Sequence, residues 1–326
     1  MAKNINVLVT GGAGYIGSHT CLELSKNGYN PITYDNLSTG RKSFVKWGPF
    51  VKGDLLDKNK IIKTIKKFKI GSVIHLAAKS QVEESELKKK SYFENNVLGT
   101  ITLLDAMIEC NLDKIIFSST AAVYGNNLNK SLKEVDKISP INMYGLSKYL
   151  CETILLNYSK SSKVNFIVLR YFNASGSDYN SKIGELHFPE THLMPRVCQK
   201  LLNNQIIDIY GNDYATKDGT CVRDFVHVRD IALAHIASLK TVMKEKVNKA
   251  YNIGTGKGHS VLQIIKLFEN KLGKKGKINF LKKRDYDAQY LVANASLFSK
   301  KFNWKAKYSS INNIIKSEVE WRKLIQ

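Results

Sequence analysis

Hydrophobic positions in the first half of the chain alternate between short continuous apolar runs and longer runs with helical spacing. The short runs predict buried strands at residues 5–10, 31–34, 50–52, 72–76 and 114–117. The helically spaced runs predict helices at residues 15–28, 61–68, 92–110 and 144–158. Strands and helices that alternate in this way form a parallel sheet with helices on both faces. We therefore predict an α/β protein built on a doubly wound parallel sheet.

The second half of the chain follows a less regular pattern. From Tyr171 onward the alternation breaks down, and the loops are rich in Gly, Asn and Asp. A chain of 326 residues is long enough for two lobes. We predict one domain at residues 1–171 and a smaller C-terminal α/β domain at residues 172–326, with a strand and helix at 224–240 that return to the first domain.

A glycine-rich turn joins the first predicted strand to its helix. Residues 11–17 read Gly-Gly-Ala-Gly-Tyr-Ile-Gly and contain Gly-x-Gly-x-x-Gly, which lets backbone approach a pyrophosphate at a helix N-terminus. The second strand ends at Asp35, about 20 residues further on, where Rossmann domains place a ribose-binding carboxylate. A carboxylate there repels a 2′-phosphate, so the pattern favours NAD over NADP, although Arg41 and Lys42 lie nearby. The alternative is a glycine turn that binds nothing.

Tyr144 and Lys148 are the candidate catalytic pair. They lie four residues apart on a predicted helix, so their side chains share one face. A free tyrosine, with a pKa of about 10, is a poor base at neutral pH, but a nearby ammonium favours the phenolate and makes a general base possible. The alternative is an exposed pair on a helix, because this spacing alone is common.

Candidate ligand-binding residues gather where the predicted strands end. Ligands of doubly wound sheets bind beyond the carboxyl ends of the strands. Those ends carry residues 11–17, Asp35, Asp54, 77–78 and 118–120. One crevice is therefore expected to collect them.

Several motifs together resemble the extended short-chain dehydrogenase/reductase family. They are the glycine motif, His-Leu-Ala-Ala at 75–78, Asn-Asn at 95–96, Ser-Ser-Thr at 118–120 and Tyr-x-x-x-Lys. Residues 169–173, 211–214, 218–228 and 251–254 are similar to the branch of this family that epimerises UDP-hexoses at C4. The resemblance runs nearly end to end.

The resemblance implies reversible C4 epimerisation of UDP-glucose and UDP-galactose through a 4-keto intermediate, with tightly bound NAD. It implies that Tyr144 is the base and that Thr120 hydrogen-bonds the 4-oxygen and relays the proton. It also implies that Lys148 holds the nicotinamide ribose and, together with the cationic nicotinamide ring, lowers the pKa of Tyr144. The residues expected at the cofactor are Gly11, Gly14, Tyr15, Ile16, Gly17, Asp35, Asn36, Asp54, Leu55, Leu76, Ala77, Ala78, Asn95, Ser118, Tyr144, Lys148 and Tyr171. Those expected at the UDP-sugar are Thr120, Asn173, Leu193, Tyr210, Arg223, Arg284, Asp287 and Leu291.

Residues next to Thr120 separate epimerisation from related reactions. Dehydratases of the family follow this threonine with Asp-Glu to eliminate water, whereas this chain has Ala121 and Ala122. Alanine exchanges no proton, so these positions favour epimerisation. For Arg223, bidentate binding of a diphosphate is the functional interpretation, and a local ion pair with Asp224 is the structural one.

The chain departs from the enteric-type epimerases at several positions. It has Thr120 for Ser, His192 for Asn, Phe225 for Tyr, and Ser80 for a basic residue. Threonine keeps the catalytic hydroxyl, and we interpret His192 as structural, without acid–base work. Leu291 replaces a tyrosine that closes the sugar pocket, so N-acetylated UDP-sugars are predicted as further substrates. An epimerase acting on another UDP-sugar, such as the acetamido or uronic-acid forms, is the enzymatic alternative.

The formal net charge of +22 at pH 7 raises the question of an anionic partner. The excess is mostly lysine in separate segments, and arginine, the preferred reader of phosphate and base edges, is scarce. We interpret a solvated lysine-rich surface and predict neither a nucleic-acid nor a membrane partner. The non-enzymatic alternative is a dinucleotide-binding regulatory or RNA-associated protein that uses this surface.

Cysteine spacing and the lengths of the apolar runs indicate the cellular compartment in which the protein is located. The five cysteines lack paired metal spacing, which predicts free thiols in a reducing cytoplasm and no metal site. No apolar run approaches the roughly 18 residues that span a bilayer, and the first strand leaves no room for a signal peptide. The resemblance adds a homodimer, with the helices at 92–110 and 144–158 as its contact.

Overall fold

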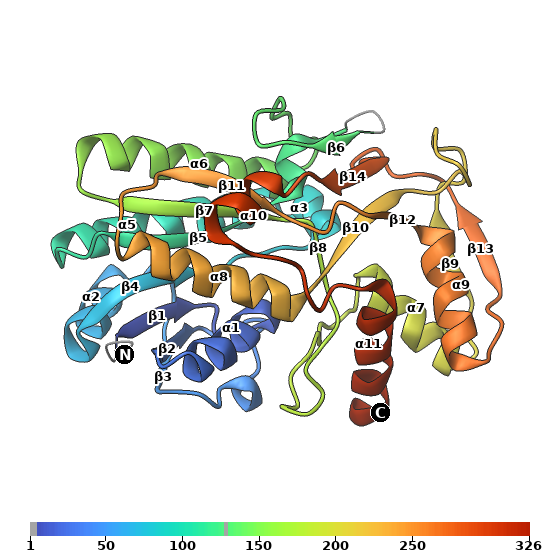
Figure 1. The fold of residues 1–326 in the computed structure, drawn as a ribbon, viewed down its shortest axis with the longest axis horizontal. Helices are drawn as coiled ribbons and strands as arrows, with labels where there is room; N and C mark the ends of the chain where they lie inside the picture. The colour runs from blue at the N-terminus through green and yellow to red at the C-terminus, as the bar shows by residue number, and fades with distance from the viewer. Residues whose placement is uncertain (1–4, 127–129) are drawn as a thin grey trace.

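A seven-stranded parallel sheet forms the centre of the computed structural model, which describes residues 5–126 and 130–326 (Figure 1). Its strand order is β11-β7-β5-β4-β1-β2-β3. The strands are β1 (Asn6–Thr10), β2 (Asn30–Asp35), β3 (Phe50–Lys52), β4 (Ile70–His75), β5 (Lys114–Thr120), β7 (Asn165–Tyr171) and β11 (Lys249–Ile253). The central strands are almost wholly apolar because helices cover both faces of the sheet. The predicted doubly wound α/β sheet is confirmed. Residues 1–4, on which the predicted lack of a signal peptide partly rests, lie outside the described residues.

Two helical layers enclose the sheet. On one face α1 (Tyr15–Lys26) packs against α8 (Val228–Val242), and on the other lie α2 (Lys58–Phe68), α5 (Gly99–Glu109) and α6 (Met143–Ser161). Within β1, Val7 and Val9 join the α1–α8 core whereas Leu8 joins the opposite core. This alternation follows from the period of two along a strand.

The chain returns to the first layer after entering the second half. α8 lies against α1, as Figure 1 shows in the foreground, and β11 pairs with β7 at the edge of the sheet. The sequence pattern predicts a returning helix in this region but does not place β11 in the sheet. The division at residue 171 stays a prediction.

The predicted single helix at residues 92–110 is interrupted. The structure has α4 (Lys89–Tyr92), a π-helical segment η2 (Phe93–Leu98) and then α5. The wider turn carries the buried Asn96, whose amide donates to Lys79 O at 3.0 Å and to Ser147 Oγ at 3.0 Å. Apolar spacing does not distinguish an α turn from a single π turn, and such turns are frequent at functional sites.

The remaining strands form two smaller sheets. One has the order β12-β10-β14-β6, with β8 paired to β10, and the other joins β9 to β13. Their bounds are β6 (Ser131–Leu132), β8 (Asn173–Ser175), β9 (Ile207–Tyr210), β10 (Val222–His227), β12 (Gly258–Ser260), β13 (Ile278–Leu281) and β14 (Tyr290–Ala293). These sheets carry the second half of the chain past the carboxyl ends of the large sheet.

Three helices pack around a separate core in the second half. They are α7 (Leu193–Leu202), α9 (Val261–Leu272) and α11 (Ile311–Ile325). A further helix, α10 (Ser296–Phe302), packs instead on the α1–α8 core through Phe298. The short helical turns are η1 (Lys42–Phe44), α3 (Val82–Leu87) and η3 (Ala121–Tyr124). Among the described residues, no helix combines the length and apolar character needed to cross a membrane.

Candidate functional site

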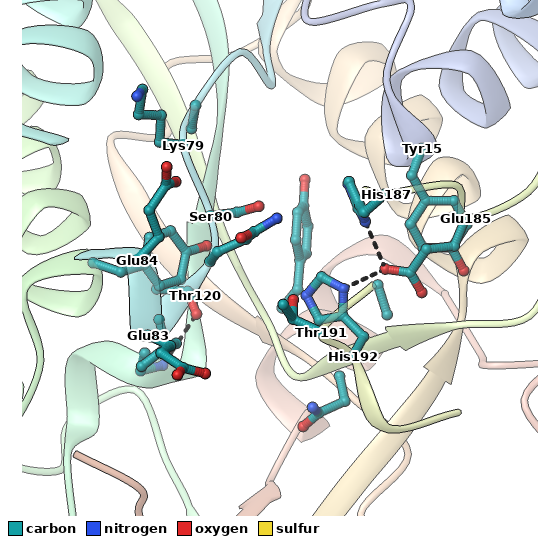
Figure 2. Close-up of a pocket in the computed structure, with 18 of the residues that line it drawn as sticks. Tyr15, Lys79, Ser80, Glu83, Glu84, Thr120, Glu185, His187, Thr191 and His192 are labelled. Atoms are coloured by element: carbon teal, nitrogen blue, oxygen red, sulfur yellow. Dashed lines mark hydrogen bonds and ion pairs between the residues drawn. The ribbon is translucent and has the colours of Figure 1, made fainter. Parts of the chain in front are cut away.

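A cavity of about 820 Å³ lies where the large sheet meets the second half of the chain. Thr120 and Glu83 lie on one wall in Figure 2, opposite Tyr15, Glu185 and His192. The predicted site residues that line it are Gly11, Gly14, Tyr15, Ile16, Gly17, Asp35, Asn36, Leu55, Leu76, Ala77, Ala78, Asn95, Ser118, Thr120, Tyr144, Lys148, Tyr171, Asn173, Leu193, Tyr210, Arg223, Arg284, Asp287 and Leu291.

Asp54 is not among the described residues that line this cavity. Gly53 and Leu55 line it on either side in sequence. The Asp54 carboxylate accepts from the Asn36 amide at 2.9 Å and from the backbone N–H of Leu56 at 2.9 Å. Asp54 therefore contacts Asn36, which lines the cavity, without lining the cavity itself.

The glycine turn forms a close-packed cradle at one end of the cavity. Gly11 has φ +71°, and a Cβ there would lie 2.6 Å from the backbone nitrogen of Ala77. A Cβ on Gly17 would lie 2.0 Å from the carbonyl oxygen of Gly11. Side chains are thus excluded at Gly11 by the positive φ and by the backbone that follows β4, and at Gly17 by the carbonyl of Gly11. The close approach of Gly17 to Gly11 brings the N-terminus of α1 to the cavity.

Asp35 ends β2 beside this cradle. Its carboxylate accepts from the backbone N–H of Ala13 at 3.0 Å and of Leu37 at 2.8 Å. Burial raises the pKa of Asp35, and these two hydrogen bonds oppose the rise. Arg41 and Lys42 are the nearby cations that could suit the 2′-phosphate of NADP. In the structure each contacts an aromatic ring: Arg41 lies over the ring of Phe188 and Lys42 over that of Phe50.

Thr120 and Tyr144 form a linked pair of hydroxyls. The Thr120 Oγ1 accepts from the backbone N–H of Ala122 at 3.1 Å, which leaves the threonine proton free for the phenol of Tyr144. Burial raises the pKa of Tyr144 to about 12, and the bond with Thr120 opposes the rise. Alone, the buried phenol therefore keeps its proton at neutral pH. The lowering that the resemblance implies depends on Lys148 together with the cationic nicotinamide ring, and it stays a prediction.

Lys148 lies one turn beyond Tyr144 on α6 and is almost fully buried. Burial lowers its pKa to about 8, against the opposing charges of Cys151 and Glu152. Its ammonium lies over the ring of Phe117, 4.6 Å from the centroid. A buried ammonium here supplies positive charge at the strand ends that any bound anion or phenolate experiences.

The N-terminus of α6 approaches the strand that carries Thr120. Asn142 caps the helix, with its side-chain oxygen accepting from the Gly145 N–H at 2.8 Å. A Cβ on Gly145 would lie 2.6 Å from the carbonyl oxygen of Ala122. Glycine after Tyr144 thus permits the close approach that brings the two hydroxyls together.

A buried ion pair fixes α6 on the sheet beneath the site. Arg170 of β7 binds Glu152 of α6, with Nη2 to Oε2 at 2.6 Å, and also donates to the Tyr124 hydroxyl at 2.8 Å. Ser119 donates to the same carboxylate. The sequence stretches that resemble the epimerase branch include Arg170, but no periodicity identifies its partner.

Aromatic and charged residues form the opposite end of the cavity. The Arg284 guanidinium lies over Tyr210, 4.2 Å from the ring centroid, and binds Asp287 through Nη2 at 2.6 Å. Its Nη1 lies 3.6 Å from Glu83 of α3. Arg284 thus links both halves of the chain at the mouth of the cavity.

The alternative of a local Arg223–Asp224 ion pair does not match the geometry. The Asp224 carboxylate is buried and accepts from the backbone N–H groups of Thr255, Gly256 and Ala293. Arg223 instead lines the cavity. Consecutive residues of β10 therefore point to opposite sides, with Asp224 in the core and Arg223 at the cavity.

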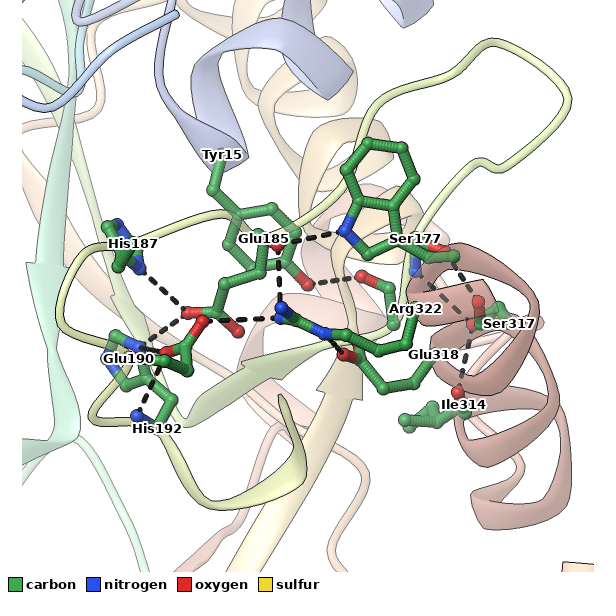
Figure 3. Close-up of polar contacts among 12 residues, drawn as sticks. Tyr15, Ser177, Glu185, His187, Glu190, His192, Ile314, Ser317, Glu318 and Arg322 are labelled. Atoms are coloured by element: carbon green, nitrogen blue, oxygen red, sulfur yellow. Dashed lines mark hydrogen bonds and ion pairs between the residues drawn. The ribbon is translucent and has the colours of Figure 1, made fainter. Parts of the chain in front are cut away.

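Sequence reasoning missed a cluster of charged residues on the cavity wall. Glu185, His187, Glu190 and His192 offer ligand atoms that lie within 4.8 Å of one another. Arg322 of α11 binds Glu190 at 3.2 Å and joins the cluster in Figure 3. Two of the chain's seven histidines and two glutamates within eight residues are a visible signal, but their shared position depends on the distant α11.

Comparison with known proteins gives concordant results. Residues 7–254 match the NAD dependent epimerase/dehydratase family. The UDP-glucose 4-epimerase of Rhizobium leguminosarum bv. trifolii is 40% identical over 97% of this chain and 96% of its own length. The UDP-glucose 4-epimerase of Brucella ovis, crystallised with NAD, has a TM-score of 0.93 at 40% identity, with 97% of each chain covered.

A related structure with a wider named substrate range also aligns. The UDP-Glc/GlcNAc 4-epimerase of Campylobacter jejuni has a TM-score of 0.84 at 33% identity, covering 98% of this chain and 99% of that one. These likenesses confirm the resemblance that the motifs indicate. The chain belongs to the NAD dependent epimerase/dehydratase family.

Proposed function

We propose that this protein is a UDP-glucose 4-epimerase that uses tightly bound NAD. The observation that carries the proposal is the Tyr144–Thr120 hydroxyl pair, placed between a glycine cradle and an arginine-lined end of the same cavity. Beside this pair the chain has Ala121 and Ala122, at the two positions where dehydratases carry Asp and Glu. The site therefore has groups to move a proton at a sugar hydroxyl and lacks the acidic pair that eliminates water in dehydratases.

The residues at the cradle fit NAD. Gly11 and Gly17 leave room only for backbone, and the N-terminus of α1 favours a pyrophosphate. The Asp35 carboxylate accepts from two backbone groups and keeps lone pairs for ribose hydroxyls. When bound, NAD supplies the hydride acceptor and donor at C4 of the sugar. Lys148 is the residue that would hold the nicotinamide ribose.

The chain's own groups handle the proton. Tyr144 accepts the proton of the 4-hydroxyl and returns it, while Thr120 bonds the 4-oxygen and passes the proton on. When NAD is bound, the positive charge of Lys148 together with the cationic nicotinamide ring would lower the pKa of Tyr144, against the rise that burial causes. Because both hydroxyls belong to rigid elements, β5 and α6, they stay in place while the sugar presents either face.

UDP occupies the other end in this proposal. Arg223 and Arg284 bind its diphosphate, which matches guanidinium geometry. Tyr210, Asn173 and Asp287 complete that end, with Asp287 orienting Arg284. Glu83 also contacts Arg284 and fixes it between two carboxylates.

Leu291 favours a second substrate class. It lines the cavity on β14, paired with Arg223 on β10. A leucine leaves more room than the tyrosine that closes the pocket in epimerases restricted to plain hexoses. We therefore propose that UDP-N-acetylglucosamine and UDP-N-acetylgalactosamine are also interconverted.

One assay tests both substrates. The purified protein is given UDP-galactose and UDP-N-acetylgalactosamine separately, without added NAD, and C4 epimerisation is followed. We expect turnover of both, and we expect Leu291→Tyr to lower turnover of the acetamido sugar selectively. Turnover of UDP-galactose alone would remove Leu291 as the determinant. Turnover of neither, even with NAD added, would overturn the proposed activity.

We also propose a homodimer in the cytoplasm, joined through η2, α5 and α6. Leu98, Ile108 and Leu156 are apolar yet 41–47% exposed on these neighbouring helices. Sedimentation should give twice the 36.8 kDa chain mass, and Leu156→Glu should shift the equilibrium to monomer. Val135→Glu, at an exposed apolar residue outside these helices, is the matched control. A wild-type monomer at micromolar concentration would contradict the proposal.

A further inference from the structure

A second cavity, of about 810 Å³, lies outside the site described above and shares only Phe225 with its lining. Three connections of the chain enclose it, from β11 to β12, from β14 to α10 and from α10 to α11 (Figure 1). Cavities of about 300–1,000 Å³ are the usual size for small-molecule sites. The second cavity therefore has room for a ligand of its own.

Buried side chains form the floor of the second cavity. Phe225 is 3% exposed and Trp304 is 6% exposed, and Ala293 is also buried. The indole N–H of Trp304 already donates to the backbone carbonyl of Asp230 at 3.2 Å, so the ring offers a ligand only its apolar surface. The floor therefore suits the organic part of a small molecule.

Three exposed lysines, Lys257, Lys305 and Lys307, form the rim of the second cavity. None of them has an ion pair with a described residue, whereas Lys301 of the adjoining α10 pairs with Glu245 at 2.7 Å. The described residues that line this cavity include no aspartate and no glutamate. An uncompensated group of ammonium ions around a cavity attracts a multiply charged anion.

Lys257 belongs to a glycine-rich loop that reads Gly-Thr-Gly-Lys at residues 254–257. Loops of this kind often bind phosphate through successive backbone N–H groups. Here the N–H groups of Thr255 and Gly256 donate instead to the carboxylate of Asp224, at 3.0 Å and 2.9 Å. The loop therefore offers a ligand the ammonium of Lys257 rather than its amides.

Neutral donors lie on the same side of the second cavity as Lys305 and Lys307. Ile311 and Asn312 line it at the start of α11, where the first amides of a helix have no partner within the helix. Ser310 accepts from the Asn313 N–H at 3.3 Å, which leaves its own hydroxyl proton for a ligand. These donors add hydrogen bonds to the charge that the lysines supply.

We propose that the second cavity binds a phosphorylated small molecule, whose phosphate contacts Lys257, Lys305 and Lys307 and whose organic part lies on Phe225 and Trp304. A small molecule fits better than a nucleic acid, because the charge surrounds a cavity with an apolar floor. The site goes beyond the proposed function, since the UDP-sugar and NAD occupy the first cavity. It also gives part of the lysine excess a binding role, where the sequence indicates only a solvated surface.

The first test is calorimetry with inorganic pyrophosphate, on protein that carries NAD and is saturated with UDP, so that the first cavity is filled. The salt is about 0.15 M, which screens distant surface charges. We expect one equivalent to bind. The double variant Lys305→Gln/Lys307→Gln should lose roughly 10-fold or more in affinity, the lower bound for hydrogen bonds to charged groups. Lys257→Gln, from the opposite side of the cavity, should also weaken binding.

The double variant Lys300→Gln/Lys316→Gln is the matched control. It removes the same charge from exposed lysines of α10 and α11 that do not line the second cavity. Its affinity for pyrophosphate should stay within about twofold of the wild type, because exposed charges at a distance are screened. Thermal unfolding should be unchanged in both double variants, since all four side chains are exposed.

The floor is tested with phenyl phosphate and inorganic phosphate, which differ by one apolar ring. Phenyl phosphate should bind the wild type roughly 10-fold more tightly, the gain from burying the ring, and Lys305→Gln/Lys307→Gln should weaken both. Three results would overturn the inference: no pyrophosphate binding in the presence of UDP, equal losses in the two double variants, or equal affinity for the two phosphates. The comparison between the double variants does not depend on the proposed epimerase activity.

Discussion

Tyr144→Phe should epimerise UDP-galactose about 10²- to 10⁴-fold more slowly than the wild type, the range for losing a positioned general base. The variant keeps the ring and removes only the oxygen that exchanges the proton of the 4-hydroxyl. Thr120 then has no phenol to exchange a proton with, although it still accepts from the Ala122 N–H. The remaining hydroxyl has no group of suitable basicity beside it, so the loss should appear in kcat.

Binding should survive the same change. The contacts proposed for UDP, at Arg223 and Arg284, do not involve the Tyr144 oxygen, and NAD keeps its contacts at the glycine cradle and with Lys148. Bound NAD per chain and the Kd for UDP should therefore match the wild type. A fall in kcat with KM nearly constant is the signature of an interaction that acts only in the transition state.

Tyr149→Phe is the matched control for this experiment. Tyr149 lies on the same helix but outside the residues that line the cavity, and packs near Val123 and Phe172. Loss of its hydroxyl should change kcat less than threefold. If Tyr144→Phe keeps a tenth of the wild-type rate, another group is the base and the proposed proton path is wrong.

The sequence predicts most of the cofactor end, because its signals are local. The glycine spacing at residues 11–17 and the carboxylate at Asp35 each follow an apolar strand. In a parallel sheet all such strand ends meet at one edge. Gly11, Asp35 and Ala77 accordingly line one cavity.

Distant partners account for what the sequence does not predict. Arg223 lacks a local ion pair because the backbone N–H groups of Thr255 and Ala293 take up the carboxylate of Asp224. The charge of His192 depends on Glu185 beside it, and Arg322 of the last helix donates to the backbone carbonyl of Glu185. The Tyr144–Lys148 spacing is visible locally, but the burial that raises the pKa of Tyr144 is a property of the assembled core.

Glu152→Gln should lower the free energy of unfolding by about 3–5 kcal/mol, the cost of breaking a buried ion pair on one side. Arg170 is buried in β7, and its guanidinium donates to both oxygens of the carboxylate, with distances of 2.6–3.2 Å. Glutamine keeps the shape but cannot neutralise the charge. The buried ammonium of Lys148 lies one turn away, so the variant leaves two buried cations near each other.

Urea unfolding of Glu152→Gln and of Glu109→Gln compares the loss of a carboxylate from a buried ion pair with the same loss from an exposed pair. The difference in unfolding free energy between the two variants measures the effect of burial. Glu109 pairs with Lys58 at 3.1 Å, a normal ion-pair distance, but both side chains are about half exposed. Water already solvates those charges, so Glu109→Gln should cost less than about 1 kcal/mol. Equal losses in the two variants would mean that the Arg170–Glu152 pair contributes no more than a surface pair. A much larger loss at Glu152, with an unchanged urea dependence, would show that this pair is what holds α6, and with it Tyr144 and Lys148, against β5 and β7.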